Sequence, residues 1–162
     1  MTDEDYLRLA LEQASLAEAL GEVPIGAILV ADGTIIASAH NRTVCDHDPT
    51  AHAEILALRA GGLALGNHRM GGASLYVTLE PCIMCTGALI QARIDRLIFG
   101  AYDDRIGACG SAFDLARHRR LNHHIREIRG GVLEDECRAQ LQRFFRERRG
   151  KDGLPPQAGR TL

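Results

Sequence analysis

The stretch "ASLYVTLEPCIMCTGALIQARIDRLIFGAY" (73–102) contains three segments that follow one another without a long loop. Residues 73–79 and 94–102 are short, apolar and rich in strand-forming residues, which favours two strands. Residues 81–93 begin at a proline, a residue favoured in the first turn of a helix, and predict a helix. A strand, a helix and a second strand in succession predict a parallel crossover, and therefore an α/β fold.

The segments outside this stretch continue the alternation of strands and helices. Two short apolar runs flank the turn "ADG" (31–33), so 24–40 predicts a β-hairpin, and 125–130 predicts a last short strand. Apolar periodicity and helix-end residues predict three further helices, at 3–20, 48–62 and 134–149. We expect Asp48 or Thr50 to cap the second of these helices and its final glycine pair to end it. The elements together predict a mixed sheet with helices on both faces.

The length of 162 residues suits one compact domain, which we place at 1–150, followed by a tail at 151–162 that we expect to be disordered. Apolar residues make up 46% of the chain and charged residues 25%, a balance typical of a soluble globular protein. No apolar run approaches the roughly 18 residues of a membrane span. The start, "MTDEDYLRLALEQA", is acidic, whereas a secretory signal opens with basic residues, so we expect a cytoplasmic protein.

The net charge of −2 conceals an asymmetry along the chain. Residues 1–116 carry 7 Lys and Arg against 15 Asp and Glu, a net charge of −8. Residues 117–162 carry 12 against 6, a net charge of +6. A basic end of this kind attracts polyanions such as nucleic acid, although a solvated helix face followed by a tail has the same composition.

Cys82 and Cys85 lie three positions apart at the start of a predicted helix, so their side chains share one face. The positive end of the helix dipole favours the thiolate form of both. The stretch "HAE" (52–54) lies at the start of the preceding helix and adds an imidazole. Zinc prefers Cys sulfur and His nitrogen, and a catalytic zinc site uses three protein ligands. We therefore predict that His52, Cys82 and Cys85 bind zinc.

Glu54 needs a separate role, because two residues correspond to about 200° around a regular helix. His52 and Glu54 can both reach one site only if that site lies beyond the first turn of the helix. A carboxylate in this place would carry protons between a zinc-activated water and the substrate.

The cysteines leave two other interpretations open. A lone C-x-x-C is also found in redox pairs and in structural zinc sites. A structural site would need a fourth ligand, but the sequence contains no second C-x-x-C, and Cys45, Cys109 and Cys137 are isolated. A redox pair would leave His52 and Glu54 unexplained. An odd number of cysteines, five, argues against a disulfide framework.

The pattern H-x-E…P-C-x-x-C resembles the zinc-dependent nucleobase deaminases of the cytidine/deoxycytidylate deaminase superfamily. The resemblance is to their tRNA adenosine deaminase family, and it extends over about residues 3–149. It is carried by the stretches "GEVPIGAILV", "DPTAHAEILALR", "LYVTLEPCIMCTGALI", "RIDRLIFGAYDDRIGACGS", "LNH" and "DECRAQLQRFFRERR".

The resemblance implies a three-layer α/β/α cytidine-deaminase-like fold with a five-stranded mixed sheet. It also implies a homodimer with one zinc ion per subunit. The reaction that it implies is hydrolytic conversion of adenosine to inosine at the wobble position of a tRNA anticodon, typically in the arginine tRNA. In that reaction a zinc-bound hydroxide attacks C6 of adenine while Glu54 acts as the proton shuttle.

The resemblance further implies a set of substrate- and RNA-binding residues: Asn41, Ala53, Asp103, Asp104, Arg105, Asn122, Phe144, Phe145 and Arg149. Of the two phenylalanines, we expect one to lie in the core and one near the RNA. Two positions depart from the family pattern, with Arg119 and Arg120 in place of Pro-Gly and Thr43 in place of Pro. A zinc deaminase of a free base or nucleoside, such as guanine or cytidine, stays an alternative, as does a non-enzymatic zinc-stabilised RNA-binding module.

Overall fold

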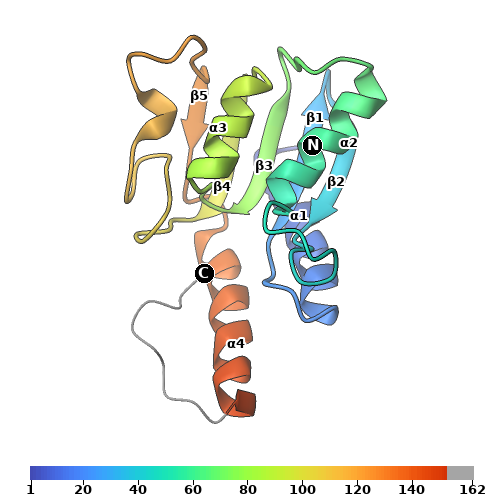
Figure 1. Cartoon of the computed structure of the whole chain (residues 1–162), viewed down its shortest axis with the longest axis vertical. Helices are drawn as coiled ribbons and strands as arrows, with labels where there is room; N and C mark the ends of the chain where they lie inside the picture. Colours follow the sequence, from blue (N-terminus) through green and yellow to red (C-terminus); the bar gives the residue numbers. More distant parts are fainter. Residues whose placement is uncertain (153–162) are drawn as a thin grey trace.

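The computed structural model describes residues 1–152, which form one mixed sheet covered by helices on both faces (Figure 1). The strands are ordered β2-β1-β3-β4-β5. β1 pairs antiparallel with both β2 and β3, whereas β3, β4 and β5 are parallel to one another. The elements are α1 (Asp3–Ala19), β1 (Gly26–Ala31), β2 (Thr34–His40), α2 (Ala53–Leu65), β3 (Ser74–Leu79), α3 (Ile83–Gln91), β4 (Arg96–Ala101), the 3-10 helix η1 (Leu115–Arg117), β5 (Glu127–Arg129) and α4 (Glu134–Asp152).

This architecture confirms the predicted α/β fold with a five-stranded mixed sheet and the predicted parallel crossover β3-α3-β4. α2 and α3 pack against each other on one face of the sheet, in front of it in Figure 1. α1 covers the other face together with α4, whose Gln140 side chain donates hydrogen bonds to the Leu11 carbonyl and to the Ser15 hydroxyl of α1. All six residues of β3 are buried, as expected for a strand covered on both faces.

The layers approach closely where α1 crosses β1. A Cβ atom at Gly26 would lie 2.0 Å from the carbonyl oxygen of Ala10, so only glycine fits between the helix backbone and the strand.

The hairpin of β1 and β2 also forms where the sequence predicts it. Asp32 and Gly33 both have positive φ angles, of 49° and 72°, as the two central residues of a type I′ turn require.

The predicted start and end of α2 are wrong. Asp48 and Thr50 do not cap this helix, because they form a separate turn in which the Thr50 N–H and hydroxyl both donate to Asp48 Oδ1. The N-cap is His52, four residues after Asp48 and two after Thr50. The helix also passes through the glycine pair and ends at Gly66, which has the left-handed conformation of a C-cap. Gly61 faces the sheet, where a Cβ would lie 2.3 Å from a methyl group of Leu29.

The helix α4 continues to Asp152, three residues beyond its predicted end, and the rest of the predicted tail lies outside the described residues. Within residues 1–152, no helix combines the length and the apolar character needed to cross a bilayer.

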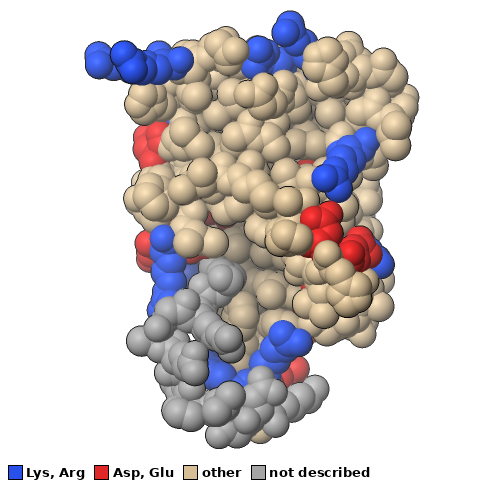
Figure 2. Space-filling model, in the orientation of Figure 1, with Lys and Arg blue, Asp and Glu red and all other residues tan. Residues whose placement is uncertain are grey.

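Figure 2 shows the charged side chains on the face seen in Figure 1. Lys and Arg side chains lie along its upper edge, where the chain leads into β5 and α3 ends, with no Asp or Glu among them.

Candidate metal centre and a pocket at the same edge of the sheet

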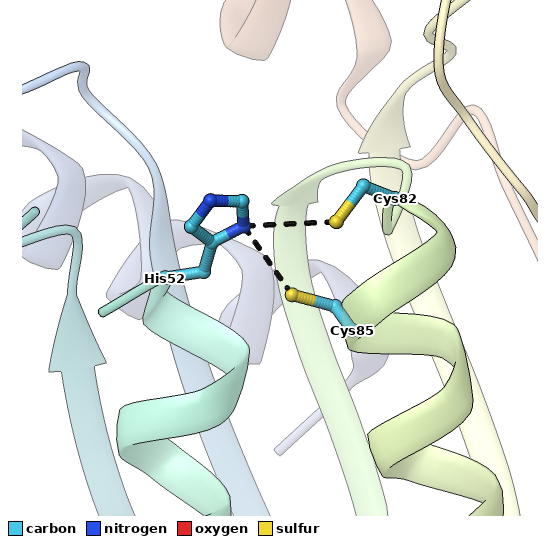
Figure 3. Close-up of side chains that lie close together, drawn as sticks. All are labelled: His52, Cys82 and Cys85. Carbon is cyan, nitrogen blue, oxygen red and sulfur yellow. Dashed lines mark hydrogen bonds between the residues drawn. The ribbon is translucent and has the colours of Figure 1, made fainter. Parts of the chain in front are cut away.

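Three side chains from two helix starts meet at one point (Figure 3). The Nδ1 atom of His52 lies 3.7 Å from Cys82 Sγ and 3.4 Å from Cys85 Sγ. His52 is the N-cap of α2 and Cys82 is the N-cap of α3, both with extended backbone, and Cys85 lies one turn further along α3. The two helices lie side by side on the sheet, so their starts bring the three ligand atoms within 4.8 Å of one another.

The spacing of these atoms fits a zinc ion. A tetrahedral zinc with Zn–N near 2.0 Å and Zn–S near 2.3 Å places the nitrogen and each sulfur about 3.5 Å apart. The two N–S distances, 3.4 and 3.7 Å, lie on either side of this value. Within residues 1–152, no fourth His, Cys, Asp or Glu joins the group. The donor set is therefore that of a zinc site with three protein ligands and one position for a small molecule.

The contact between the two cysteines shifts the pKa values of their thiols in opposite directions. The hydrogen bond with Cys85 lowers the pKa of the Cys82 thiol to about 4. Burial raises this pKa, whereas His52 and the N–H of Cys85 lower it further. The same contact, together with burial, raises the pKa of Cys85. A bound cation would favour the thiolate form of both cysteines, because metal ligands bind deprotonated.

Glu54 is buried, with 4% of its surface exposed, in the first turn of α2. Two positions two residues apart within a helix point about 200° away from each other. His52 precedes the helix, so this rotation does not separate its side chain from that of Glu54. Burial raises the pKa of Glu54 to about 7, against smaller opposing effects that include those of His52 and Cys85. The carboxyl group can therefore gain or lose a proton near neutral pH.

The start of α2 is held by a side chain from the end of β2. Asn41 is 5% exposed, and its Oδ1 accepts a hydrogen bond of 2.8 Å from the N–H of Ala53. This bond satisfies a donor that a helix start leaves free, and it fixes the backbone of Ala53, which lies between His52 and Glu54. Asn41 and Ala53, both predicted to contact the substrate, are therefore directly joined at the metal centre.

A cavity of about 260 Å³ opens at the carboxyl ends of β3 and β4, the same edge of the sheet at which α3 begins. Its lining includes five of the predicted RNA-binding residues: Asp103, Asp104, Arg105, Phe145 and Arg149. Asp103 is 3% exposed. Its Oδ1 accepts from the N–H groups of Arg105 and Ile106, while its Oδ2 is buried without a hydrogen-bond partner among the described residues. An unpartnered buried carboxylate oxygen favours a ligand that brings a donor.

The two phenylalanines differ in burial, with one in the core and one at the cavity. Phe144 is buried, and the guanidinium of Arg148 lies 5.1 Å from the centre of its ring. Phe145 is half-buried and lines the cavity, with its ring edge-on to that of Phe144.

Asn122 does not join the other predicted RNA-binding residues. Its Oδ1 accepts a hydrogen bond from Arg93, which follows the C-terminal end of α3. Cys82 and Arg93 are eleven residues apart, which corresponds to about 16 Å along a helix axis. Asn122 therefore lies at the opposite end of α3 from the metal centre of the same chain.

Two buried carboxylates near the site were not predicted from the sequence. Glu80 is 2% exposed and accepts hydrogen bonds from the N–H groups of Asp103, Cys109 and Ser111, and from the Ser111 hydroxyl. It therefore shapes the loop that carries Asp103. Its position, between the buried strand β3 and Pro81, was the available signal, since a charged residue in an apolar run needs a buried partner.

Glu22 has the same function for the loop after β2. It is 1% exposed and accepts from the Cys45 N–H at 2.7 Å and from the Thr43 hydroxyl at 3.3 Å. Thr43, which departs from the family pattern, is therefore fixed by a side-chain hydrogen bond.

Comparison with known proteins places this geometry in a family. A model of the cytidine and deoxycytidylate deaminase zinc-binding region matches residues 1–101, which include all three ligand candidates and Glu54. A tRNA-specific adenosine deaminase of Haemophilus influenzae is 50% identical over 148 residues, which cover 91% of this chain and 85% of the relative.

Two solved structures extend the comparison to three dimensions. The first comes from work on A-to-I editing by tRNA:A34 deaminases at the wobble position of transfer RNA. It has a TM-score of 0.81 and 45% identity, over 85% of this chain and 99% of that one. The second is a guanine deaminase from Bacillus subtilis, with a TM-score of 0.61 and 38% identity, over 63% of this chain and 66% of that one.

Proposed function

The chain belongs to the cytidine and deoxycytidylate deaminase family, and we propose that it is a tRNA adenosine deaminase, a hydrolase that converts adenosine to inosine at the wobble position of a tRNA anticodon. The observation that carries the proposal is the 50% identity, over 91% of the chain, to a tRNA-specific adenosine deaminase. The His52, Cys82 and Cys85 group supports it, because hydrolytic deaminases of this family are zinc-dependent.

We assign zinc, one ion per subunit, to His52, Cys82 and Cys85. When bound by three protein ligands, zinc activates a water molecule as a nucleophile near neutral pH. His52 contributes a neutral nitrogen and the two cysteines contribute negative charge, so the protein donors balance the charge of the ion. The N-terminal ends of α2 and α3 both point at this site and favour the negative charge of the sulfurs.

Glu54 is the proposed proton carrier. A carboxyl group with a pKa of about 7 exchanges protons readily near neutral pH. Glu54 takes a proton from the attacking water and donates it to N1 of adenine. It then takes the remaining proton from the hydroxyl group now on C6 and gives it to the amine, which leaves as ammonia, so that adenosine and water give inosine and ammonia.

The remaining predicted residues have proposed roles in holding the RNA. The Oδ1 of Asn41 is already bound to Ala53, so its NH₂ group is available as a donor to the base. Phe145 offers a ring on which an unpaired base can stack. Arg105 and Arg149 lie beside it and suit phosphate contacts, while Phe144 supports Phe145 from the core. Rotating a base out of its stack costs less in a loop than in a duplex, which favours an anticodon loop.

We also propose that the protein is a homodimer. An apolar groove of about 870 Å³ lies between α2 and α3, with Leu58, Leu63 and Met70 among its lining. Leu63 is 86% exposed, and an exposed apolar patch of this kind is typical of an interface. Sedimentation should give twice the mass of the chain, and a monomer at micromolar concentration would refute the dimer.

The arginine tRNA as substrate and a cytoplasmic location follow from the family resemblance and remain proposals.

The test of the function uses total tRNA from a strain that lacks inosine. The zinc-loaded protein should convert the wobble adenosine to inosine, detected by sequencing, and mapping the inosine should show whether the arginine tRNA is the substrate. Unchanged adenosine with zinc confirmed in the protein would refute the proposal.

A deaminase of a free base or nucleoside is the second candidate, because a guanine deaminase shares the fold. Turnover of guanine or cytidine in the absence of RNA, without inosine in tRNA, would favour it.

A further inference from the structure

Residues 117–126, "RHRRLNHHIR", contain four arginines, three histidines and no acidic residue. We propose that this segment, which we call the basic segment, is a second RNA-binding surface that holds phosphates of the tRNA outside the nucleotides entering the pocket. The inference rests on the proposed function and names a contact that the metal centre and its pocket do not supply.

The basic segment is placed away from the reaction. His123 Nε2 lies 2.8 Å from the carbonyl oxygen of Ile94, and Asn122 accepts from Arg93. Both partners follow the C-terminal end of α3, whereas Cys82 marks its start, about 16 Å away along the helix axis. At this distance the basic segment cannot contact the base that reacts at the metal centre of the same chain. A folded RNA is wide enough to reach both places at once. Figure 2 shows Lys and Arg side chains along this edge of the molecule.

The positive charge of the segment is concentrated on two side chains. The acidic residues around it are already paired: Asp114 with Arg117 at 3.1 Å, Asp95 with Arg126 at 2.6 Å, and Glu127 with Arg96 at 2.6 Å. Arg119 and Arg120 are exposed and form no ion pair with any residue that the structure describes. Two adjacent unneutralised guanidinium groups attract phosphates, which they can bind through several N–H donors.

The backbone that carries these two arginines is held in a defined shape. The N–H of Arg120 donates to His118 Nδ1 at 3.2 Å, and His124 Nε2 donates to the carbonyl oxygen of His118 at 3.3 Å. A cavity of about 420 Å³ opens beside this turn, with Arg117, His124 and Arg126 on its walls. A surface that is already ordered loses less entropy when it binds a charged partner than a free loop does.

The test compares Arg119→Ala/Arg120→Ala with Arg8→Ala/Arg143→Ala, which removes the same charge from the α1–α4 face. Binding is measured in a Glu54→Gln background, to full-length tRNA and to a short single-stranded anticodon-loop oligonucleotide. We expect the first pair to weaken tRNA binding roughly three- to tenfold and to lower the slope of log Kd against log salt by about 1.5 to 2. Binding of the short oligonucleotide, and kcat at saturating tRNA in the Glu54 enzyme, should not change.

Two results would overturn the inference. Equal tRNA affinity and salt slope for the two double variants would show that the basic segment is only a solvated surface. Equal loss for the tRNA and the short oligonucleotide would place its contact in the anticodon loop itself. The inosine assay on wild-type protein distinguishes failure of the proposed function from failure of this inference. If the proposed function is wrong, the wild-type protein forms no inosine in any tRNA.

Discussion

At the scale of single residues, the chemistry depends on where two helices begin. His52 and Cys82 occupy N-cap positions, and Glu54 and Cys85 follow within the first turn of each helix. All four were predicted from the sequence, because each belongs to a short local pattern whose meaning does not depend on the rest of the fold. Glu80 and Glu22 were not predicted, because their partners are backbone N–H groups more than twenty residues away in the sequence.

The first prediction concerns Glu54. Glu54→Gln keeps the shape of the side chain but removes its ability to carry a proton. We expect zinc content and thermal stability close to wild type and a loss of about 10²–10⁴-fold in kcat/KM for tRNA, the usual contribution of a positioned general base. The exposed Glu12→Gln is the matched control and should leave kcat/KM unchanged. Activity within tenfold of wild type in Glu54→Gln would show that another group moves the protons.

At the scale of elements, side chains rather than local propensity set several boundaries. The sequence predicted every strand and all four long helices, because apolar runs, apolar periods or helix-end residues mark them. It misplaced the start of α2, because Asp48 and Thr50 are good caps in isolation but bond to each other instead. The bond from Asn41 then sets the start of the helix at Ala53. This contact between segments twelve residues apart cannot be read from local periodicity.

The second prediction concerns the loop after β4, which four hydrogen bonds attach to Glu80. Glu80→Gln places an NH₂ group where N–H donors now meet an oxygen. Leaving buried donors without an acceptor should lower the free energy of unfolding by about 1–3 kcal/mol, measured by urea titration. KM for tRNA should rise more than kcat falls, because the loop carries Asp103, which lines the cavity that we propose to bind RNA.

Ser111→Ala is the control, since it removes only the hydroxyl donor to Glu80 and should cost about 0.5–1.5 kcal/mol. A variant Glu80→Gln as stable as wild type, with the same KM, would show that the loop keeps its shape without this carboxylate.

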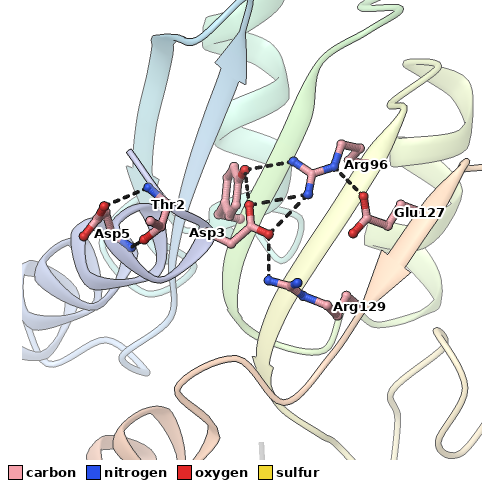
Figure 4. A network of polar contacts seen from close by, with 7 residues as sticks. Thr2, Asp3, Asp5, Arg96, Glu127 and Arg129 are labelled. Atoms are coloured by element: carbon pink, nitrogen blue, oxygen red, sulfur yellow. Dashed lines mark hydrogen bonds and ion pairs between the residues drawn. The ribbon is translucent and has the colours of Figure 1, made fainter.

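At the scale of the whole molecule, one ionic network joins the first helix to the sheet (Figure 4). Asp3, in the first turn of α1, accepts from Tyr76 on β3, Arg96 on β4 and Arg129 on β5. Arg96 also donates to Glu127. The network thus connects three strands and a helix that are up to 126 residues apart in the sequence. Sequence patterns predicted the layers but not this connection, because it depends on the register of the sheet.

The third prediction is a dependence of stability on pH. Partial burial raises the pKa of Asp3, but hydrogen bonds and charges from Tyr76, Arg96 and Arg129 outweigh it and hold the pKa below 3.8. A depressed pKa means that the stabilisation is complete above the unfolded value and is lost as the pH falls below about 4. Asp3→Asn should therefore be less stable than wild type by about 1–2 kcal/mol at pH 6, and the difference should shrink as the pH falls through the lowered pKa of Asp3.

Asp32→Asn is a suitable control for Asp3→Asn, because Asp32 is an exposed turn residue with positive φ, which asparagine tolerates. Urea midpoints between pH 3 and 7 give the comparison. A difference between Asp3→Asn and wild type that stays constant with pH would show that the charge of Asp3 is not what stabilises the fold.

The fourth prediction is that zinc removal destabilises the molecule, since a ligand that binds only the folded state adds to its stability. With free zinc about a thousandfold above Kd, chelation should lower Tm on the order of 10 °C, and added zinc should restore it. His52→Ala should show no such shift on chelation. An unchanged Tm for the chelated wild type would mean that the two helix starts keep their packing without an ion.

The most direct measurement of the central claim is zinc K-edge X-ray absorption on the purified protein, combined with metal analysis. Three protein ligands with one open position predict one zinc per chain, about two sulfur neighbours near 2.3 Å and about two nitrogen or oxygen neighbours near 2.0–2.1 Å. Three or four sulfur neighbours, or a preparation that deaminates tRNA without zinc, would contradict the account.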